Sequence, residues 1–272
     1  MDKLERGHGL LTILLLFLAG GCGLPHGAQP MPQPVPRSNP APDGRTQVMI
    51  FAGDSAWSPE IDSVTEILYN HGVSYKSSDS WELNQLSLEQ LSSYRLLIFP
   101  GGDAPTMTTS LTLGTRANLR DAVQKKGLSF IGFCAGAWLA ISPLPPEGEA
   151  ARYGIGVVEG PLQEFSFLEK TGQHWALDRI TLPGHATREL LWYGGPATPE
   201  TPGGVVARYS DGKPAISQLH SGNGFVIVSG VHPAATQAVL EALGLRSSEA
   251  VYPEFAWQLF EAGLKQAPMP AF

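Results

Sequence analysis

The 272-residue sequence has few cysteines and few charges. Its two cysteines, Cys22 and Cys134, cannot form the disulfide framework that stabilises many small secreted domains. Charged residues make up 16% of the chain and the net charge is -7, with no cluster of Lys and Arg that could neutralise a run of phosphates. We therefore expect no nucleic-acid partner. The histidines and cysteines show no metal-ligand spacing, and we expect no metal and no cofactor.

The chain also lacks an apolar run of the roughly 20 residues that a membrane-spanning helix needs. The run from Leu10 to Ala19 is shorter, and it follows Lys3 and Arg6, which is the layout of a secretory signal. Leu18-Ala19-Gly20-Gly21-Cys22 resembles a bacterial lipobox, although Leu is commoner than Ala three positions before the cysteine. The alternative is an ordinary signal peptide or an uncleaved anchor.

The lipobox resemblance implies that residues 1–22 are a lipoprotein signal and that Cys22 carries acyl chains such as palmitate. Two or three such chains anchor a protein stably to a membrane. Gly23 follows the cysteine instead of Asp, so nothing signals retention at the inner membrane. We therefore expect a lipid-anchored protein of the bacterial cell envelope, at the outer membrane in a Gram-negative cell.

Residues 23–45 are rich in proline and show no periodic apolar pattern, which predicts an extended, solvated tether. Residues 46–272 are enough for one α/β domain. In their first half, apolar strand patterns alternate with helical patterns, which predicts a doubly wound, mostly parallel sheet. The expected strands are residues 47–52, 73–77, 95–100 and 128–133, and the clearest expected helices are 58–71 and 113–126.

The second half predicts antiparallel strands separated by glycine and proline turns. Asp211-Gly212 and Asn223-Gly224 are strong hairpin signals. The expected strands are residues 157–158, 179–182, 190–193, 205–209 and 225–229, followed by helices at 236–243 and 253–264. In doubly wound sheets the ligand crevice lies beyond the carboxyl ends of the parallel strands. Gly53-Asp54, Gly101-Gly102 and Cys134 should all reach that edge.

Cys134 lies in Gly132-Phe133-Cys134-Ala135-Gly136, between an apolar strand pattern and a helix start. This pattern is typical of a nucleophile elbow. At a helix amino end, unpaired backbone N–H groups and the helix dipole favour a thiolate over a thiol. Cysteine is also among the most buried residue types, so the alternative is an inert packing residue.

His232 follows the apolar run 225–231 and precedes Pro233, which places it at the same sheet edge as Cys134. A Cys and a His in contact can exchange a proton and activate the thiol for attack on a carbonyl. The backbone N–H groups of Gly102 and Ala135 could then bind the oxyanion. The alternatives are a structural role for His232 and a simple tight turn at Gly101-Gly102.

The motifs Pro100-Gly101-Gly102, Gly132-Phe133-Cys134-Ala135-Gly136 and Gly230-Val231-His232-Pro233 resemble those of class I glutamine amidotransferase-like domains. More closely, Tyr193-Gly194-Gly195-Pro196, Ala207-Arg208-Tyr209 and Ser229-Gly230-Val231-His232-Pro233 resemble the stand-alone form of the amino-terminal domain of biotin protein ligases. The resemblance covers about residues 47–264.

This resemblance implies a flavodoxin-like fold and a Cys134–His232 site for an amide or related acyl bond in a small molecule or peptide. Gly101, Asp103 and Tyr193 are candidate substrate contacts, although aromatic residues such as Tyr193 and Trp192 are more often part of a core than in contact with a substrate. No ligase catalytic domain follows in the sequence, so we do not expect the chain to ligate biotin. The sequence does not indicate an oligomeric state.

The sequence departs from the class I pattern at Ala234, where these enzymes place a Glu that orients the histidine. Losing such a residue can cost a triad several orders of magnitude in rate. Glu241, Asp54 or a backbone carbonyl are candidates to replace it. Two other interpretations remain open: a binding or scaffold protein that has lost turnover, and a redox-responsive thiol at Cys134.

Overall fold

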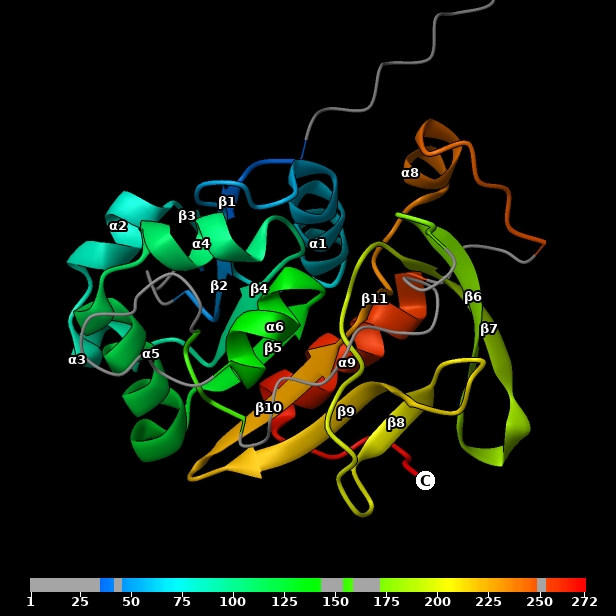
Figure 1. Cartoon of the computed structure of the whole chain (residues 1–272). Coiled ribbons are helices and arrows are strands. Elements are labelled where there is room, and N and C mark those ends of the chain that lie inside the picture. The colour runs from blue at the N-terminus through cyan, green and yellow to red at the C-terminus, as the bar shows by residue number, and fades with distance from the viewer. Residues whose placement is uncertain (1–34, 42–45, 143–153, 159–171, 249–252) are drawn as a thin grey trace, which may run out of the picture. The chain divides into compact units, whose positions relative to one another are not determined.

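The computed structural model describes residues 35–41, 46–142, 154–158, 172–248 and 253–272. In this part of the chain, strands form one eleven-stranded sheet in the order β1-β3-β2-β4-β5-β10-β9-β8-β6-β7-β11 (Figure 1). The strands are β1 (Ser38–Asn39), β2 (Val48–Phe51), β3 (Tyr75–Ser78), β4 (Leu96–Phe99), β5 (Ser129–Phe133), β6 (Ala176–Thr181), β7 (Thr187–Trp192), β8 (Val205–Arg208), β9 (Pro214–Ser221), β10 (Gly224–Ser229) and β11 (Val231–His232).

Helices lie between the strands of the first half and at the carboxyl end of the chain. They are α1 (Ser58–Asn70), α2 (Ser80–Gln85), α3 (Leu88–Leu91), α4 (Ala104–Ser110), α5 (Leu113–Lys126), α6 (Ala135–Ile141), α8 (Gln237–Ala242) and α9 (Pro253–Lys265), with a 3-10 turn η1 (Pro183–His185). The side chain of Thr112 caps the amino end of α5, and Gly127 ends it in the left-handed conformation.

The sheet has a parallel part and an antiparallel part. Strands β3, β2, β4, β5 and β10 pair in parallel, whereas β9, β8, β6, β7 and β11 continue the sheet with antiparallel pairs. This confirms the predicted α/β class, with antiparallel strands added in the second half.

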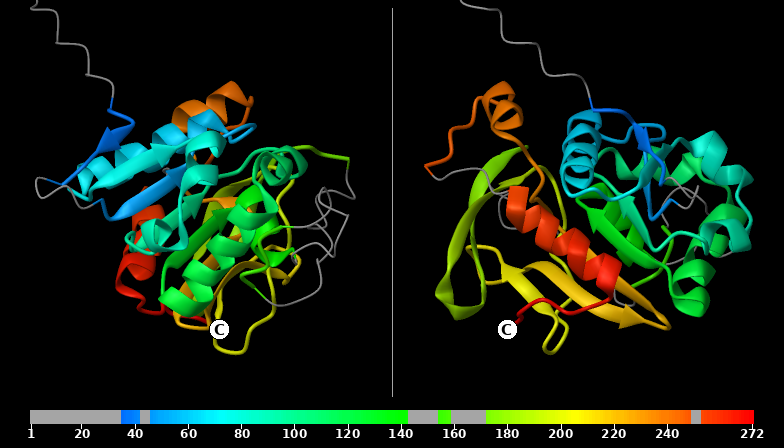
Figure 2. Two further views of the ribbon diagram at one scale, coloured as in Figure 1. Left: turned by 90° about the vertical axis from the view of Figure 1, so that its left-hand side faces the viewer. Right: turned by 180° about the vertical axis from the view of Figure 1, so that it is seen from behind.

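Helices cover both faces of the parallel part. Ile50 and Ile98 belong to a core cluster that includes residues of α1 and α9, while their neighbours Met49 and Leu97 belong to a second cluster with α5 and α6. Because side chains alternate along a strand, the two clusters lie on opposite faces of the sheet. Figure 2 shows α9 lying across one face, with α5 and α6 behind the sheet in the right-hand view.

Two segments differ from the sequence-based expectation. Ser38–Asn39, assigned above to the tether, pair antiparallel with β3 in the sheet, and Val35 packs against the core. Val157 and Val158, expected as a strand, are buried outside the sheet, and the Val158 N–H donates to the carbonyl of Ala140 at the end of α6. In the second case the apolar pattern indicated burial correctly but not the backbone partner.

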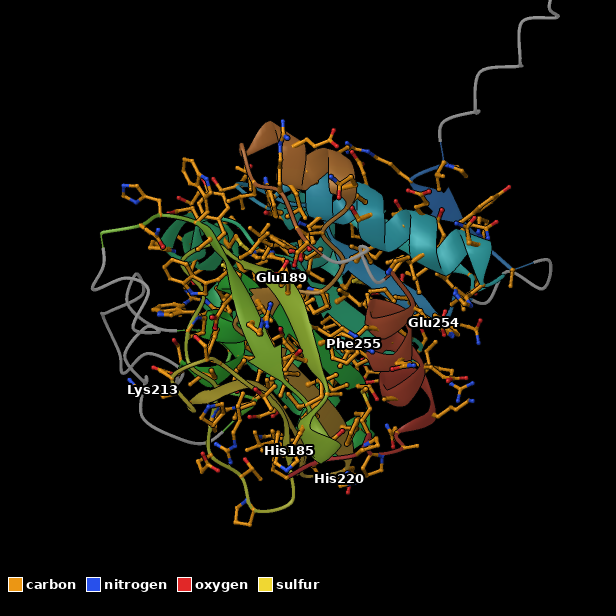
Figure 3. All side chains as sticks on the ribbon, turned by 90° about the vertical axis from the view of Figure 1, so that its right-hand side faces the viewer. His185, Glu189, Lys213, His220, Glu254 and Phe255 are labelled. Atoms are coloured by element: carbon orange, nitrogen blue, oxygen red, sulfur yellow. The ribbon has the colours of Figure 1, made fainter. Side chains whose placement is uncertain are left out.

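Glu189 of β7 connects the antiparallel part of the sheet to the segment after α8 through hydrogen bonds (Figure 3). Its carboxylate accepts hydrogen bonds from the hydroxyls of Ser247 and Ser248 and from the backbone N–H of Ser248. These hydrogen bonds, first of all the one from the Ser248 N–H, lower the pKa of the Glu189 carboxyl.

The expected signal segment and Cys22 lie outside the described residues. None of the described helices has the length and apolar character needed to cross a bilayer.

The turn from β5 to α6 packs directly against the end of β4. A side chain at Gly136 would overlap the backbone carbonyl of Phe99, and one at Gly132 would overlap the backbone of Gly136. Strand and helix therefore approach each other closely only because these positions lack a Cβ. The close approach fixes where Cys134, between the two glycines, leaves the sheet.

We expect Gly136→Ala to lower the free energy of unfolding by about 1–3 kcal/mol, because the added methyl forces the turn away from β4. Gly114→Ala is the matched control, since a Cβ there would meet only the Thr112 hydroxyl oxygen, at 3.8 Å. Urea denaturation measures both. Equal effects of the two substitutions would contradict the packing argument.

Candidate functional site

Cys134 lies at the turn between β5 and α6 in a strained backbone conformation. Its φ is 47° and its ψ is -105°, a region that non-glycine residues rarely adopt. The turn is held because the Cys134 N–H donates to the Ser229 carbonyl at 2.7 Å, which joins the ends of β5 and β10. The side chain is 7% exposed. This is the geometry that the elbow pattern predicts.

His232 lies just beyond the end of β10, in the short strand β11 that pairs with β7. Because β10 and β5 are adjacent parallel strands, their carboxyl ends bring His232 and Cys134 to the same place. Both residues line a cavity of about 290 Å³ together with Trp57, Gly102, Asp103 and Tyr193. The Trp57 and His232 rings meet edge to face, with centroids 5.0 Å apart.

Glu60 binds the imidazole of His232 at its Nδ1 atom. It lies in the first turn of α1 and is 1% exposed. Its Oε1 is 2.9 Å from His232 Nδ1, and its Oε2 accepts a hydrogen bond from the Gly101 N–H at 2.6 Å. Both carboxylate oxygens of this buried group are thus partnered. With Nδ1 occupied, Nε2 is the ring nitrogen left for Cys134.

The surroundings of His232 determine its charge. Burial by itself would lower the pKa of His232, but the negative charge of Glu60 and the interactions with Cys134 outweigh burial and raise the pKa to about 10. The raised pKa favours the protonated imidazolium at neutral pH. Its Nε2 is buried and has no hydrogen-bond partner within the described residues.

Neither carboxylate suggested from the sequence orients His232. Glu241 lies in α8, where it accepts a hydrogen bond from Gln237, and Asp54 is exposed on the loop after β2. Ala234 is buried in the core cluster that includes α1 and α9. Glu60 takes the position behind the ring, and the suggestions of Glu241 and Asp54 were wrong.

The first-turn position explains why sequence reasoning missed Glu60. An acidic residue after Ser58-Pro59 has an ordinary interpretation as a helix-start residue that complements the dipole. The structure begins α1 at Ser58, with Trp57 at the N-cap and no side-chain cap. A usable signal was the position of Glu60 in the loop and helix after β2, at the sheet edge that also carries Cys134.

Two backbone N–H groups next to the thiol have no acceptor in the described part of the chain. They belong to Gly102, at φ 151°, and to Ala135, the first residue of α6. Gly102 is held against the loop after β2, because the Trp57 N–H donates to the Gly101 carbonyl and the Asp103 N–H to the Ser55 carbonyl. A side chain at Gly102 would overlap that Ser55 carbonyl, so the position requires glycine.

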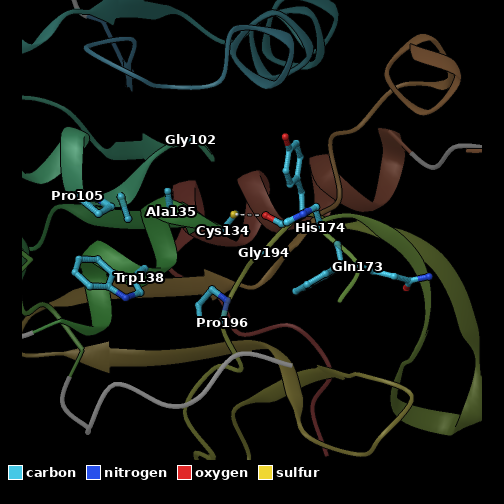
Figure 4. A pocket seen from close by; sticks show the side chains of 12 residues that line it. Gly102, Pro105, Cys134, Ala135, Trp138, Gln173, His174, Gly194 and Pro196 are labelled. Atoms are coloured by element: carbon cyan, nitrogen blue, oxygen red, sulfur yellow. Dashed lines mark hydrogen bonds between the residues drawn. The ribbon is translucent and has the colours of Figure 1, made fainter. Parts of the chain in front are cut away.

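The thiol itself points at Tyr193. Cys134 Sγ donates to the Tyr193 backbone carbonyl at 3.1 Å (Figure 4). The Tyr193 ring packs edge to face on Trp57, with centroids 5.7 Å apart, and Tyr193 is 38% exposed.

Asp103 is exposed, and its side chain caps α4 by accepting a hydrogen bond from the Thr106 N–H. Among the described residues, no group of three His, Cys, Asp or Glu side chains could hold a metal ion.

The segment carrying the Tyr193 carbonyl is fixed by close backbone packing. A side chain at Gly195 would overlap the Gly230 carbonyl, and one at Gly230 would overlap the Pro196 carbonyl. The buried Tyr209 hydroxyl donates to that same Pro196 carbonyl at 2.9 Å. Three motifs from distant parts of the sequence thus converge beside the thiol.

No family model matches the sequence, and no curated protein matches it. Several solved structures, however, align with the structure of this chain. A glutamine amidotransferase aligns with a TM-score of 0.50 at 22% identity, covering 73% of this chain and 99% of that one. SMU.1228c aligns at 0.45 with 13% identity over 82% and 96% of the two chains. DJ-1 of Schizosaccharomyces pombe aligns at 0.40 with 14% identity over 83% and 100%. The first likeness shows that the chain has the glutamine amidotransferase-like fold.

We expect Glu60→Gln to abolish most of the rise in the pKa of His232, because the amide carries no charge to offset burial. In the unchanged protein the ring stays protonated as pH rises from 6.5 and loses its proton only near pH 10. In the variant it should be neutral at pH 8. Imidazole ¹⁵N chemical shifts measure the protonation directly. A doubly protonated ring at pH 8 in the variant would contradict the role of Glu60.

Proposed function

We propose that this protein is a cysteine hydrolase of amide or related acyl bonds, with Cys134 as nucleophile, His232 as proton carrier and Glu60 as the residue that orients it. The observation that carries the proposal is the imidazole held between a buried carboxylate and a strained elbow thiol. A charged imidazolium beside a thiol favours the thiolate, which is the attacking form.

Each group then has a chemical task. The thiolate attacks the carbonyl carbon, and the N–H groups of Gly102 and Ala135 hold the oxygen as it becomes negative. The His232 Nε2 proton passes to the leaving nitrogen when the C–N bond breaks. The neutral ring, now a strong base because of Glu60, takes a proton from water, which attacks the thioester. Breaking the C–S bond releases the acid and restores the ion pair.

The resemblance to the stand-alone biotin protein ligase amino-terminal domain belongs to the same proposal. It is supported by the convergence of Gly195, Tyr209 and Gly230, which come from the motifs that carry it and which together fix the Tyr193 carbonyl against the thiol. The lipid anchor at Cys22 in the cell envelope is a further part of the proposal and is supported by the lipobox-like sequence.

The binding or scaffold alternative is favoured by one observation. Cys134 Sγ donates a hydrogen bond to the Tyr193 carbonyl, which gives the neutral thiol a resting contact that does not involve His232. In a protein without turnover this bond would persist and the thiol would react slowly. The reactivity of Cys134 therefore distinguishes the two functions.

We expect iodoacetamide to alkylate Cys134 at pH 6.5 at least about tenfold faster in the unchanged protein than in His232→Ala, because only the thiolate reacts. Mass spectrometry of the peptide containing Cys134 gives the rate, and Cys134→Ser supplies the background. Equal rates in the two proteins would favour the scaffold alternative.

Lipidation is tested separately. Cells producing the full chain should incorporate labelled palmitate into the protein, and the Cys22→Ala variant should not, because the acyl chains attach at that cysteine. Label retained in Cys22→Ala, or absent from the unchanged protein, would contradict the anchor.

A further inference from the structure

We infer that the acyl part of the substrate is uncharged and apolar or aromatic, and that free glutamine is not the substrate. This inference rests on the proposed hydrolase function and specifies which amides the site accepts. It follows from two cavities that meet at Cys134 and differ in the groups that line them.

The two cavities divide the substrate at its scissile bond. They share Gly102, Cys134 and Tyr193. His232, which must protonate the leaving nitrogen, lines only the smaller cavity, of about 290 Å³. Ala135, whose N–H is proposed to bind the oxyanion, lines only the larger cavity, of about 380 Å³ (Figure 4). The amine therefore leaves through the smaller cavity and the acyl chain lies in the larger one.

The larger cavity has apolar and aromatic walls. Among its described lining residues there is no Asp, Glu, Lys or Arg. The apolar walls come from Ala104, Pro105, Trp138, Trp192 and Pro196. Its polar side chains belong to Gln173, His174 and Tyr193, all of which are exposed residues. Flat rings and proline faces of this kind bind apolar or aromatic groups by burying their surface.

A free amino acid does not fit such a cavity. Glutamine carries an ammonium and a carboxylate on the carbon farthest from its side-chain amide, so both charges would enter the larger cavity. Charges removed from water need opposite charges or several hydrogen bonds, and the described walls of this cavity carry no charged side chain to pair with them. The same chain without the two charged groups is butanamide, which brings no charge into the cavity.

The reaction with such a substrate balances with water as the second reactant. The Cys134 sulfur forms a bond to the acyl carbon as the amide C–N bond breaks, and the amine leaves with the His232 proton. Water then adds to the thioester, gives one proton to His232, and the C–S bond breaks. The products are the uncharged chain's carboxylic acid and an amine.

Three p-nitroanilides with one leaving group test the inference: butyryl, 3-phenylpropionyl and γ-L-glutamyl. Released p-nitroaniline gives kcat/KM for the full chain in detergent. We expect 3-phenylpropionyl to exceed γ-glutamyl by at least about tenfold, with butyryl between them. A γ-glutamyl value equal to or above the other two would overturn the inference while supporting the hydrolase function.

A substitution in the wall of the larger cavity tests whether Trp138 contacts the acyl group of the substrate. Trp138→Ala should lower kcat/KM for 3-phenylpropionyl several-fold more than for butyryl, and Trp138→Phe should restore most of the difference. Trp81→Ala is the control, since Trp81 lies in α2, is 72% exposed and lines neither cavity. An equal loss for both substrates in Trp138→Ala would contradict a direct contact with the acyl group.

A binding measurement covers the case in which no anilide is cleaved. At equal concentrations, 3-phenylpropanamide and butanamide should slow iodoacetamide alkylation of Cys134, and L-glutamine should not. Protection by the uncharged amides without cleavage would uphold the cavity's preference and overturn the hydrolase function. Protection by glutamine as strong as that by butanamide would overturn the inference.

Discussion

The buried carboxylate of Glu60 connects the three parts of this site. One oxygen binds His232 Nδ1 and the other binds the Gly101 N–H, so a single side chain sets the imidazole and the loop that carries the Gly102 amide. A buried carboxylate is tolerated only when its charge and its lone pairs are satisfied, and these two partners do that. The helix α1, the loop after β4 and the strand β11 are thereby fixed relative to one another. Its negative charge also keeps the ring protonated against the effect of burial.

The sheet supplies the rest of the geometry. Parallel pairing of β4, β5 and β10 brings the Gly101-Gly102 loop, Cys134 and His232 to one edge. Cys134 keeps its positive φ because its N–H is tied to Ser229 and because Gly136 packs on Phe99. Such strain persists only where the surroundings fix it, and here it aims the thiol into the space between two cavities.

The sequence was sufficient for the parts of the site that follow from local pattern. The Gly-x-Cys-x-Gly turn, the apolar run before His232 and the Gly101-Gly102 loop each end a strand, and the sheet-edge rule brings strand ends together. Glu60 was beyond this reasoning because it is 172 positions from His232 and because an acidic residue in a first helical turn has an ordinary explanation. The Tyr193 carbonyl was also missed as a partner of the thiol, since a backbone group carries no sequence signal.

Glu60 also explains why the site can have Ala at position 234, where class I amidotransferases have Glu. A carboxylate two residues after the histidine is needed only if nothing else reaches Nδ1, and here α1 provides one from the other end of the chain. The methyl of Ala234 can then pack in the core without loss of the orienting group. The remaining constraint is the bond from Sγ to the Tyr193 carbonyl, which requires a thiol hydrogen. Ionisation removes that hydrogen, so in the proposed reaction the thiolate loses its resting contact, and the positive charge of the His232 ring is the interaction that stabilises it.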